Sequence, residues 1–354
     1  MRILVTGGAG FVGSSLSIFL KEQWRKAEVI AVDNLRRRGS ELALARLREH
    51  GVSFHHGDIR NPEDLSEVGS IDLLVECSAE ASVHSGYGDN PAYVINTNLL
   101  GTVNCLELAR RQRADIVFLS TSRVYPIDKL RSLPLERRGQ RFALAPEASG
   151  PGWSAAGITT DFPLHGSRSL YGATKLCSEL LIQEYSAMYD VRAIINRCGV
   201  LAGPWQMGKV DQGFVALWAA RHFFGGKLAY LGFEGAGLQV RDVLHVSDLC
   251  ELVRLQLSDI DRHRNRVYNV GGGAENSISL AELTALCAQR AGGDLEMGSD
   301  PETRPADIPF YVTDNAVVTE ATGWKPRRTV PVILDDIFAW LASSGKEVQR
   351  VLSG

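Results

Sequence analysis

Short hydrophobic runs alternate with longer amphipathic segments along the first two hundred residues. Each run has the length of a buried strand, and the segments between runs have helical length and spacing. The pattern predicts strands over RILVTG (2–7), AEVIAVD (27–33), VSFHHGD (52–58), IDLLVEC (71–77), DIVFLST (115–121) and VRAIINR (191–197). It predicts helices from about Phe11, over Pro91–Arg111 and over Leu170–Tyr189. Because such alternation builds βαβ units, we expect an α/β fold with a doubly wound parallel sheet.

The pattern changes after Gly203. A loop rich in glycine and polar residues follows, and later helices mix with short strands. These helices are expected near Val246–Leu257, Leu280–Ala291 and Val330–Leu341. We therefore predict that residues 1–203 form the doubly wound domain. Residues 204–354 are expected to form mainly a smaller C-terminal α/β lobe for the substrate, with some segments returning to the first domain.

The least regular stretch is a long insert, residues 127–166, which is rich in proline, glycine and arginine. It has few periodic hydrophobic positions, so it is either a disordered insert or an ordered functional loop. A long loop inside a compact domain is more often functional than idle, which favours a lid or a partner-binding segment.

Composition narrows the class of protein. The 354 residues carry a formal net charge of −3, which indicates neither a nucleic-acid-binding nor a membrane-binding surface. No hydrophobic run approaches the ~20 residues that a membrane span needs. The six cysteines form no CxxC motif and no metal-ligand spacing with histidine, which predicts reduced thiols, no metal and a cytoplasmic location.

Candidate chemistry begins at TGGAGFVG, where Gly7, Gly10 and Gly13 stand between a predicted strand and a predicted helix. In a Rossmann dinucleotide site, the first glycine allows a tight turn and the second a close approach to the pyrophosphate. The third allows the helix to pack on the strand. The free N–H groups of the helix then face the phosphates. Asp33 ends the next strand, where a carboxylate accepts hydrogen bonds from the adenosine ribose, so the sequence predicts a dinucleotide cofactor.

Asp33 favours NAD over NADP because its charge would repel a 2′-phosphate. The arginines that follow, Arg36 to Arg38, leave NADP open, since an arginine near this position can hold that phosphate; the other reading is a solvated basic loop. Asp58 and Ile59, after the third strand, suit contacts to the edge of the adenine.

Two Tyr-x-x-x-Lys pairs are present, Tyr125 with Lys129 and Tyr171 with Lys175. Pro126 follows Tyr125 and disfavours a helix there, so the first pair is not expected to share a face. The second pair lies in a helical pattern, where residues four apart do share a face. We predict that Tyr125 packs or lines the pocket.

The second pair has the chemistry of a general acid/base. The Lys175 ammonium is expected to lower the pKa of Tyr171 and to hydrogen-bond a nicotinamide ribose. Tyr171 can then take a proton from a substrate hydroxyl as hydride leaves the carbon. Thr121 lies at the end of the fifth strand, where ligands bind in open α/β sheets, and can donate its hydroxyl to the same oxygen. We predict Thr121, Tyr171 and Lys175 as the catalytic residues.

Further motifs extend along the chain up to about residue 340. They are GDIRN (57–61), NLLGT (98–102), STSRVY (120–125), YGATK (171–175), NRCGVLAGP (196–204) and QVRDVLHVSDL (239–249). With TGGAGFVG, they resemble the extended short-chain dehydrogenase/reductase family of nucleotide-sugar epimerases and dehydratases. Within it, DNLRRRGSE (33–41) and the loop 203–216 are most similar to the 2-epimerases of CDP-linked sugars.

The resemblance implies a bound NAD that takes a hydride from the sugar and returns it to the opposite face. It places Phe11, Val12, Asn34, Ala79 and Asn98 at the cofactor. It places Arg241 on the diphosphate of a CDP-linked sugar, the loop with Gln206 and Gln212 near the sugar or base, and Arg123 at the substrate. It also implies a homodimer or homotetramer through helices over Pro91–Arg111 and Leu170–Tyr189, unless these helices only cover the sheet.

Some positions depart from the family pattern. Dehydratases of the family carry Asp-Glu after the catalytic threonine; here Ser122 and Arg123 stand there, which argues against dehydratase activity. Glu80 is unexpected in the segment after the fourth strand, and Ala202 replaces a usual tyrosine. Two alternatives remain open. One is a 4-epimerase or net oxidoreductase using the same three residues, and the other is a dinucleotide-sensing protein without catalysis.

Overall fold

The computed structural model describes residues 1–88, 90–210 and 212–352. Its centre is a seven-stranded sheet in the order β14-β10-β5-β4-β1-β2-β3, in which every neighbouring pair is parallel. The strands are β1 (Arg2–Thr6), β2 (Glu28–Asp33), β3 (Ser53–His56), β4 (Leu73–Glu76), β5 (Asp115–Thr121), β10 (Ala193–Cys198) and β14 (Arg266–Val270). The predicted doubly wound sheet is confirmed, and all six predicted strands are present with ends shifted by a few residues.

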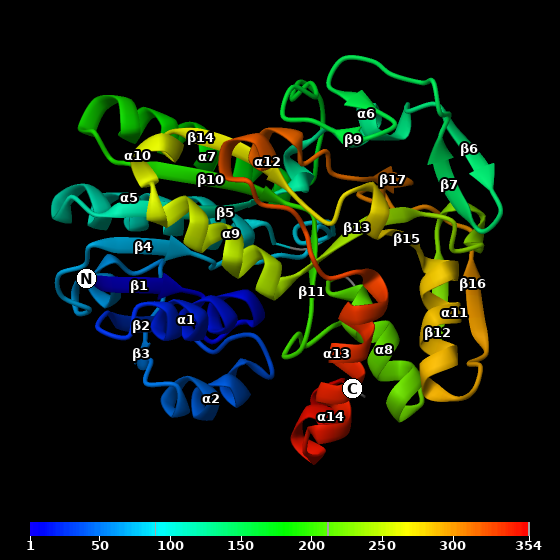
Figure 1. Ribbon diagram of the computed structural model, residues 1–354, viewed down its shortest axis with the longest axis horizontal. Helices are drawn as coiled ribbons and strands as arrows, with labels where there is room; N and C mark the ends of the chain where they lie inside the picture. The colour runs from blue at the N-terminus through cyan, green and yellow to red at the C-terminus, as the bar shows by residue number, and fades with distance from the viewer. Residues whose placement is uncertain (89, 211, 353–354) are drawn as a thin grey trace.

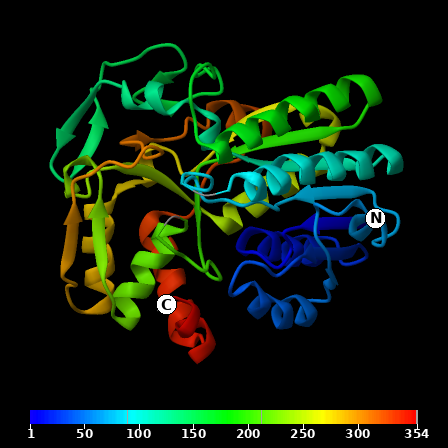
Figure 2. The ribbon, with the colours of Figure 1, turned by 180° about the vertical axis from the view of Figure 1, so that it is seen from behind.

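Helices cover both faces of this sheet (Figures 1 and 2). One face carries α1 (Phe11–Gln23), α2 (Ala43–Glu49), α9 (Val246–Ser258) and α12 (Ala316–Thr322). The other carries α3 (Pro62–Ser66), α5 (Gly101–Gln112) and α7 (Leu170–Tyr189). Successive residues of a strand point to opposite faces, so Ile3 and Val5 pack in the first cluster and Leu4 in the second. Both faces are apolar because both are buried, as in other parallel sheets.

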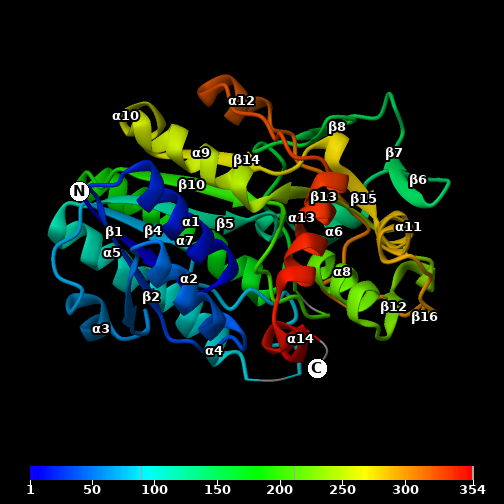
Figure 3. The same cartoon turned by 60° about the horizontal axis from the view of Figure 1, so that its bottom comes forward.

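Smaller sheets follow in the chain. β11 (Val200–Ala202) and β17 (Phe310–Tyr311) pair in parallel with β13 (Val240–His245), and β15 (Ser277–Ser279) pairs with it antiparallel. β12 (Leu228–Leu231) pairs with β16 (Met297–Asp300). The helices of this part are α8 (Phe214–Phe224), α11 (Leu280–Ala291), α13 (Val330–Ser343) and α14 (Lys346–Leu352). α13 leads into α14 at the foot of this part (Figure 3).

Three later segments return to the large sheet. β14 pairs with β10, with Asn196 opposite Tyr268, and α9 packs on α1 with α12 beside it. The short helix α10 (Ile260–His263) connects α9 to β14. We therefore keep the domain boundary at residue 203 as a proposal. The segments β14, α9 and α12 lie after this boundary but pack with the first domain.

The insert 127–166 is ordered, so its interpretation as a disordered segment was wrong. It contains α6 (Ile127–Arg131), β6 (Leu135–Arg138) paired with β7 (Arg141–Leu144), and β8 (Trp153–Ser154) paired with β9 (Gly157–Ile158). Leu130, Ile158 and Phe162 are buried in one cluster with Ile308 and Phe310. Because these partners are distant in sequence and the strands are very short, no local periodicity in the sequence predicts this structure.

The predicted helix over Pro91–Arg111 is interrupted. α4 (Ala92–Ile95) is followed by a π-helical turn, Asn96–Leu100, before α5 begins at Gly101. π turns inside helices occur frequently at functional sites. Here the turn carries Asn98, whose side chain hydrogen-bonds both backbone groups of Glu80.

Among the residues that the structure describes, no helix is both long enough and apolar enough to cross a membrane.

Candidate active site

A cavity of about 1540 Å³ lies between the carboxyl ends of the large sheet and the smaller sheets. Asp33, Thr121 and Cys198, which end β2, β5 and β10, line it from one side. Arg241 of β13 and Leu228 of β12 line it from the other. A pocket for one small ligand usually measures about 300–1,000 Å³. The cavity is therefore large enough for two ligands side by side, such as a dinucleotide and a second substrate.

The glycine turn fits a pyrophosphate. Gly7 has φ +63°, and the Gly10 N–H donates to its carbonyl oxygen over 3.0 Å. A Cβ on Gly13 would lie 2.1 Å from the same oxygen, so the helix contacts the turn without room for a side chain. α1 starts after Gly10 with no side chain capping its first N–H groups. Free N–H groups at a helix N-terminus bind phosphate oxygens.

Asp33 lines the cavity and is held in place by backbone groups. Its carboxylate accepts hydrogen bonds from the Ala9 N–H (3.1 Å) and the Leu35 N–H (2.8 Å). Burial raises the pKa of Asp33, and these N–H groups oppose that rise. The second lone pairs of its oxygens are the acceptors that the ribose hydroxyls of a dinucleotide would need.

The three arginines after Asp33 all have partners elsewhere. Arg36 lies 4.1 Å over the ring of Tyr93, and Arg38 donates to the Arg350 carbonyl. Arg37 donates to the Met207 carbonyl and to the Gln212 side chain. The sequence left open that one of them holds a 2′-phosphate; in this arrangement each guanidinium is engaged, which favours NAD.

We expect Asp33→Ala to weaken NAD binding by ~1–3 kcal/mol, the contribution typical of hydrogen bonds to a charged group. The affinity for NADP should fall less, because the negative charge that repels a 2′-phosphate is also removed. Calorimetric titration of the cofactor-free protein with each dinucleotide checks this. Asp72→Ala, on the amino side of β4 and outside the cavity lining, is the control. An unchanged NAD affinity in Asp33→Ala would contradict the assignment.

The other predicted cofactor residues divide. Phe11, Val12, Asn34, Asp58, Ile59 and Ala79 line the cavity. Asp58 accepts from Asn34 over 2.8 Å and from Arg60 over 2.7 Å. Burial alone would raise the pKa of Asp58, but these donors lower it to about 2, so it is a fixed acceptor.

Asn98 is the exception. It is buried and does not line the cavity, so its direct contact with the cofactor is not supported. Its oxygen accepts from the Glu80 N–H over 2.8 Å, and its amide donates to the Glu80 carbonyl over 3.0 Å. Asn98 therefore positions the segment after β4, which does line the cavity at Ala79 and Glu80.

The predicted catalytic residues come together in the cavity. α7 begins at Leu170, and Tyr171 and Lys175 stand one turn apart on its cavity face. Thr121, at the end of β5, lies close enough to Tyr171 for its side chain to act to lower the pKa of the Tyr171 hydroxyl. The Lys175 ammonium is buried and lies 4.0 Å from the centre of the Phe118 ring.

The electrostatics of Tyr171 differ from the sequence-based expectation. Burial raises the pKa of Tyr171; hydrogen bonding to Thr121 and the charge of Arg123 act in the opposite direction. Burial also lowers the pKa of Lys175, which the Glu76 carboxylate opposes. The predicted lowering of the Tyr171 pKa by Lys175 is therefore absent here, because burial is the largest influence and the cation that opposes it is Arg123.

Tyr125 is packed away from the cavity, which is the first of its two expected roles, and it does not line the pocket. Its hydroxyl donates to the Asn269 side chain (2.7 Å) and lies 3.1 Å from the Thr159 carbonyl, and it is absent from the cavity wall. Pro126 does not prevent a helix, however. Pro126 is the N-cap residue of α6. Lys129 therefore lies inside the helix, whereas Tyr125 lies before it, so the two side chains do not share a helical face.

One end of the cavity is rich in cations. Arg123 and Arg241 line it and are partly buried, and their guanidiniums donate to the Ala306 and Ile308 carbonyls. Burial, together with the charge of Arg123, lowers the pKa of Arg241 to about 9. Two neighbouring, partly buried guanidiniums repel each other without an anion between them, so this end is suited to bind one.

Asp307 is an anion whose charge acts on both of these arginines. Its carboxylate lies 3.3 Å from His84 Nε2 and 3.0 Å from Arg304 Nε. Burial would raise its pKa, but these two partners lower it to about 2. Asp307 is thus already shared, which leaves charge at Arg123 and Arg241 for a bound ligand.

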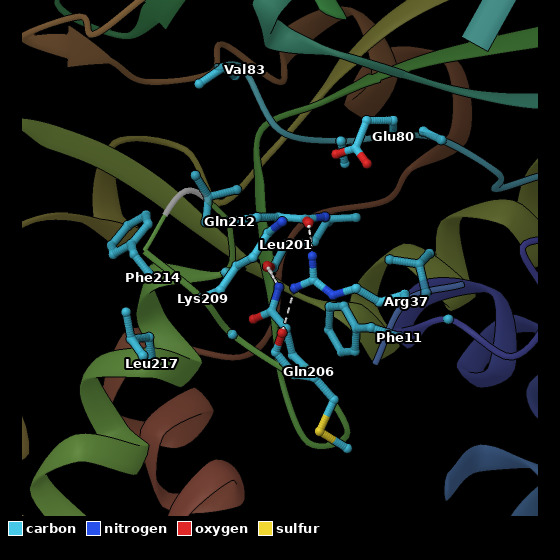
Figure 4. A pocket seen from close by; sticks show the side chains of 18 of the residues that line it. Phe11, Arg37, Glu80, Val83, Leu201, Gln206, Lys209, Gln212, Phe214 and Leu217 are labelled. Atoms are coloured by element: carbon cyan, nitrogen blue, oxygen red, sulfur yellow. Dashed lines mark hydrogen bonds between the residues drawn. The ribbon is translucent and has the colours of Figure 1, made fainter. Parts of the chain in front are cut away.

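The loop after Gly203 borders the same cavity. Gln206 and Gln212 both line it, and Gln206 donates to the Leu201 carbonyl over 2.9 Å. Figure 4 shows the Arg37 side chain, beside Phe11, reaching this loop. Asp211 lies outside the described residues. No residue of the insert 127–166 lines the cavity, so its interpretation as a lid is not supported.

Sequence reasoning missed several site residues. It did not anticipate that Glu76 acts on Lys175 or that His84 pairs with Asp307. It also did not anticipate the hydrogen bond from Arg37 to Gln212. Only Glu76 carried a signal, as a charged residue ending a buried strand. The others are contacts between distant segments. Within the described residues, no group of acidic, histidine and cysteine side chains could hold a metal ion.

Comparison with known proteins identifies the class. The family model "NAD dependent epimerase/dehydratase family" matches residues 3–271, and the chain therefore belongs to this family. Its cofactor is NAD, which fits the glycine turn and Asp33. The predicted family and cofactor are confirmed.

Particular relatives show the range of the family. The chain is 28% identical to CDP-paratose 2-epimerase of Salmonella typhi, over 97% of this chain and 100% of that protein. It is similar to the NAD complex of dTDP-glucose 4,6-dehydratase from Bacillus anthracis (25% identity, TM-score 0.78, 99% of each chain). It is also similar to the NAD complex of UDP-glucose 4-epimerase from Thermus thermophilus (27%, TM-score 0.75, 98% and 100%).

Proposed function

We propose that this enzyme epimerises a nucleotide-diphospho-sugar at carbon 2 of the sugar, with a CDP-linked sugar as the favoured substrate. The full-length similarity to a CDP-paratose 2-epimerase supports the substrate class. The observation that carries the choice of carbon is the position of Arg123. This cation influences both Tyr171 and Arg241, and all three residues line one cavity.

The choice of carbon follows from the substrate's own chemistry. The diphosphate is attached to carbon 1, so the carbon 2 hydroxyl is the ring hydroxyl next to it, whereas carbon 4 lies across the ring. A diphosphate on Arg123 and Arg241 would bring the carbon 2 hydroxyl toward Tyr171. Such charge-assisted contacts fix orientation as well as affinity.

Tyr171 would accept the proton of this hydroxyl and later return it, and the Thr121 hydroxyl would donate to the same oxygen. Lys175 would hold the nicotinamide ribose. When bound, NAD supplies a hydride acceptor that becomes the donor for the return step. Ser122 and Arg123 stand where dehydratases of the family carry two acidic residues, so the chain has no acid pair there to eliminate water.

Native mass spectrometry of the purified protein is the first test, followed by denaturation to release bound ligands. Near-stoichiometric NAD would support an enzyme that recycles its hydride. The protein would then be incubated with CDP-paratose, and the sugar followed by NMR in deuterated water. Formation of the carbon 2 epimer without solvent deuterium in the carbon 2 position would support the proposal.

Other outcomes distinguish the alternatives. Release of NADH with a keto sugar in solution would indicate a net oxidoreductase. Turnover of UDP- or dTDP-sugars at carbon 4 only would indicate a 4-epimerase. Reversible NAD(H) binding without turnover of any of these sugars would indicate a dinucleotide-sensing protein.

We also propose that the chain forms a homodimer through α5 and α7, or a homotetramer built on that pair. These helices lie side by side on one face of the sheet (Figure 2). Leu100, Leu180 and Met188 are large apolar side chains more than half exposed on or next to these helices. We expect gel filtration with light scattering to give at least twice the chain mass of 38.7 kDa. Elution as a monomer would contradict this.

A further inference from the structure

Arg37 spans the cavity. It follows β2 on the cofactor side, where Asp33 ends the strand, yet its guanidinium binds the loop on the opposite side. Nη1 donates to Gln212 Oε1 over 2.7 Å, and Nη2 donates to the Met207 carbonyl over 2.6 Å. Figure 4 shows Arg37 beside Phe11, the first residue of α1, with its guanidinium directed at this loop.

The backbone around Arg37 is fixed. Its carbonyl accepts from both the N–H (3.0 Å) and the hydroxyl (2.6 Å) of Ser40. Gly39 has φ +93°, and a Cβ there would lie 2.8 Å from the Met207 side chain. The turn therefore packs directly on the loop that Arg37 binds, so the side chain starts from a fixed point.

Neighbouring contacts join the same two sides of the cavity. Arg38 donates to the Arg350 carbonyl of α14 over 3.0 Å, and Arg46 of α2 lies 5.0 Å over the Trp205 ring. These contacts involve other residues than those that Arg37 binds. Together, these contacts link the side of the cavity that carries Asp33 and α1 to Trp205, Met207 and α14.

We propose that Arg37, Gln212 and the Met207 carbonyl form a clasp that retains the dinucleotide. The clasp links the cofactor side to the substrate loop, and the dinucleotide leaves only after both hydrogen bonds of Arg37 open. The inference goes beyond the proposed function, because it concerns the exchange of the cofactor and holds for whichever sugar is the substrate. Arg37 acts here as a positioning residue.

The test measures NAD release from the holoenzyme. Protein saturated with NAD is passed through desalting columns at timed intervals, and the retained NAD is measured after acid denaturation. Two hydrogen bonds from a charged donor are lost in Arg37→Ala, so we expect release about 10- to 100-fold faster than in the unchanged protein. Arg48→Ala, an exposed charge on α2 outside the cavity, should release NAD at the unchanged rate.

A double-mutant cycle separates a clasp from a general loosening. Gln212→Ala alone should speed release less than Arg37→Ala, because the Met207 contact remains. In the Arg37→Ala background, the same change should have almost no effect, since its partner is absent. Unchanged release from Arg37→Ala, or fully additive effects, would overturn the proposal. A protein that retains NAD through Arg37 but turns over no nucleotide sugar would overturn the proposed function and leave the clasp intact.

Discussion

Tyr171→Phe should abolish most turnover while leaving NAD bound. The substitution removes only the phenolic oxygen, which is the group that exchanges a proton with the substrate hydroxyl. General acid/base groups contribute about 10²- to 10⁴-fold to rate, and we expect kcat to fall by that factor. The cofactor's contacts with the glycine turn and Asp33 are unchanged, so bound NAD measured after denaturation should stay near the level of the unchanged protein.

Tyr125→Phe is the matched control, because it removes the same atom from the other Tyr-x-x-x-Lys pair. Its hydroxyl is buried against Asn269 and outside the cavity. The loss should appear in stability, by ~1–3 kcal/mol for buried partners left unpaired, and hardly in kcat. An inactive Tyr125→Phe beside an active Tyr171→Phe would reverse the assignment of the two pairs.

Glu179→Ala should strongly destabilise the fold. Glu179 lies on α7, one turn after Lys175. Its carboxylate accepts hydrogen bonds from Arg197 of β10, from Nη2 over 2.7 Å and from Nε over 3.1 Å. The Ser120 hydroxyl donates to the same carboxylate. Both members of the ion pair are almost fully buried, at 6% and 1% exposure of their side chains. Removing one partner leaves an uncompensated buried charge, which costs about 3–5 kcal/mol in free energy of unfolding.

Urea denaturation of the NAD-loaded protein measures this change. Glu251→Ala provides the control, since Glu251 pairs with Arg254 on the surface of α9. An exposed pair of this kind contributes about 0.2–1 kcal/mol. Equal destabilisation by the two changes would show that the buried pair does not anchor α7 to the sheet. Because Glu179 shares a helix with Tyr171, we also expect a lower kcat in any Glu179→Ala protein that folds.

The large sheet and the catalytic helix could be predicted because their signals are local. Buried parallel strands are continuous apolar runs, and the helix over Leu170–Tyr189 has the predicted bounds because Ser169 caps it and Asp190 ends it in a left-handed conformation. Tyr171, Lys175 and Thr121 could be placed together since parallel strands and the helices after them bring ligand groups to one edge.

The rest depends on contacts that no local pattern encodes. The insert 127–166 gains order from Ile308 and Phe310, which follow it by more than 140 residues in the chain. In the sequence, Arg37 is one of three arginines in a basic loop. Its hydrogen bond with Gln212 depends on the fold, which brings the two residues together. The raised pKa of Tyr171 depends on how completely the cavity buries it, which spacing along a helix does not reveal.

The position of β14 bears on how the enzyme is made. β10 is fully buried and pairs with β5 on one side and β14 on the other, but β14 starts at Arg266, after much of the smaller part. During synthesis, β1 to β5 and β10 of the large sheet are complete before β14 is made. In that interval, the outer edge of β10 has no partner strand. An unpaired apolar edge is prone to join other chains, so this interval is when the growing polypeptide is most open to aggregation. A fragment ended before Arg266 would keep that edge permanently, although it contains Thr121, Tyr171 and Lys175.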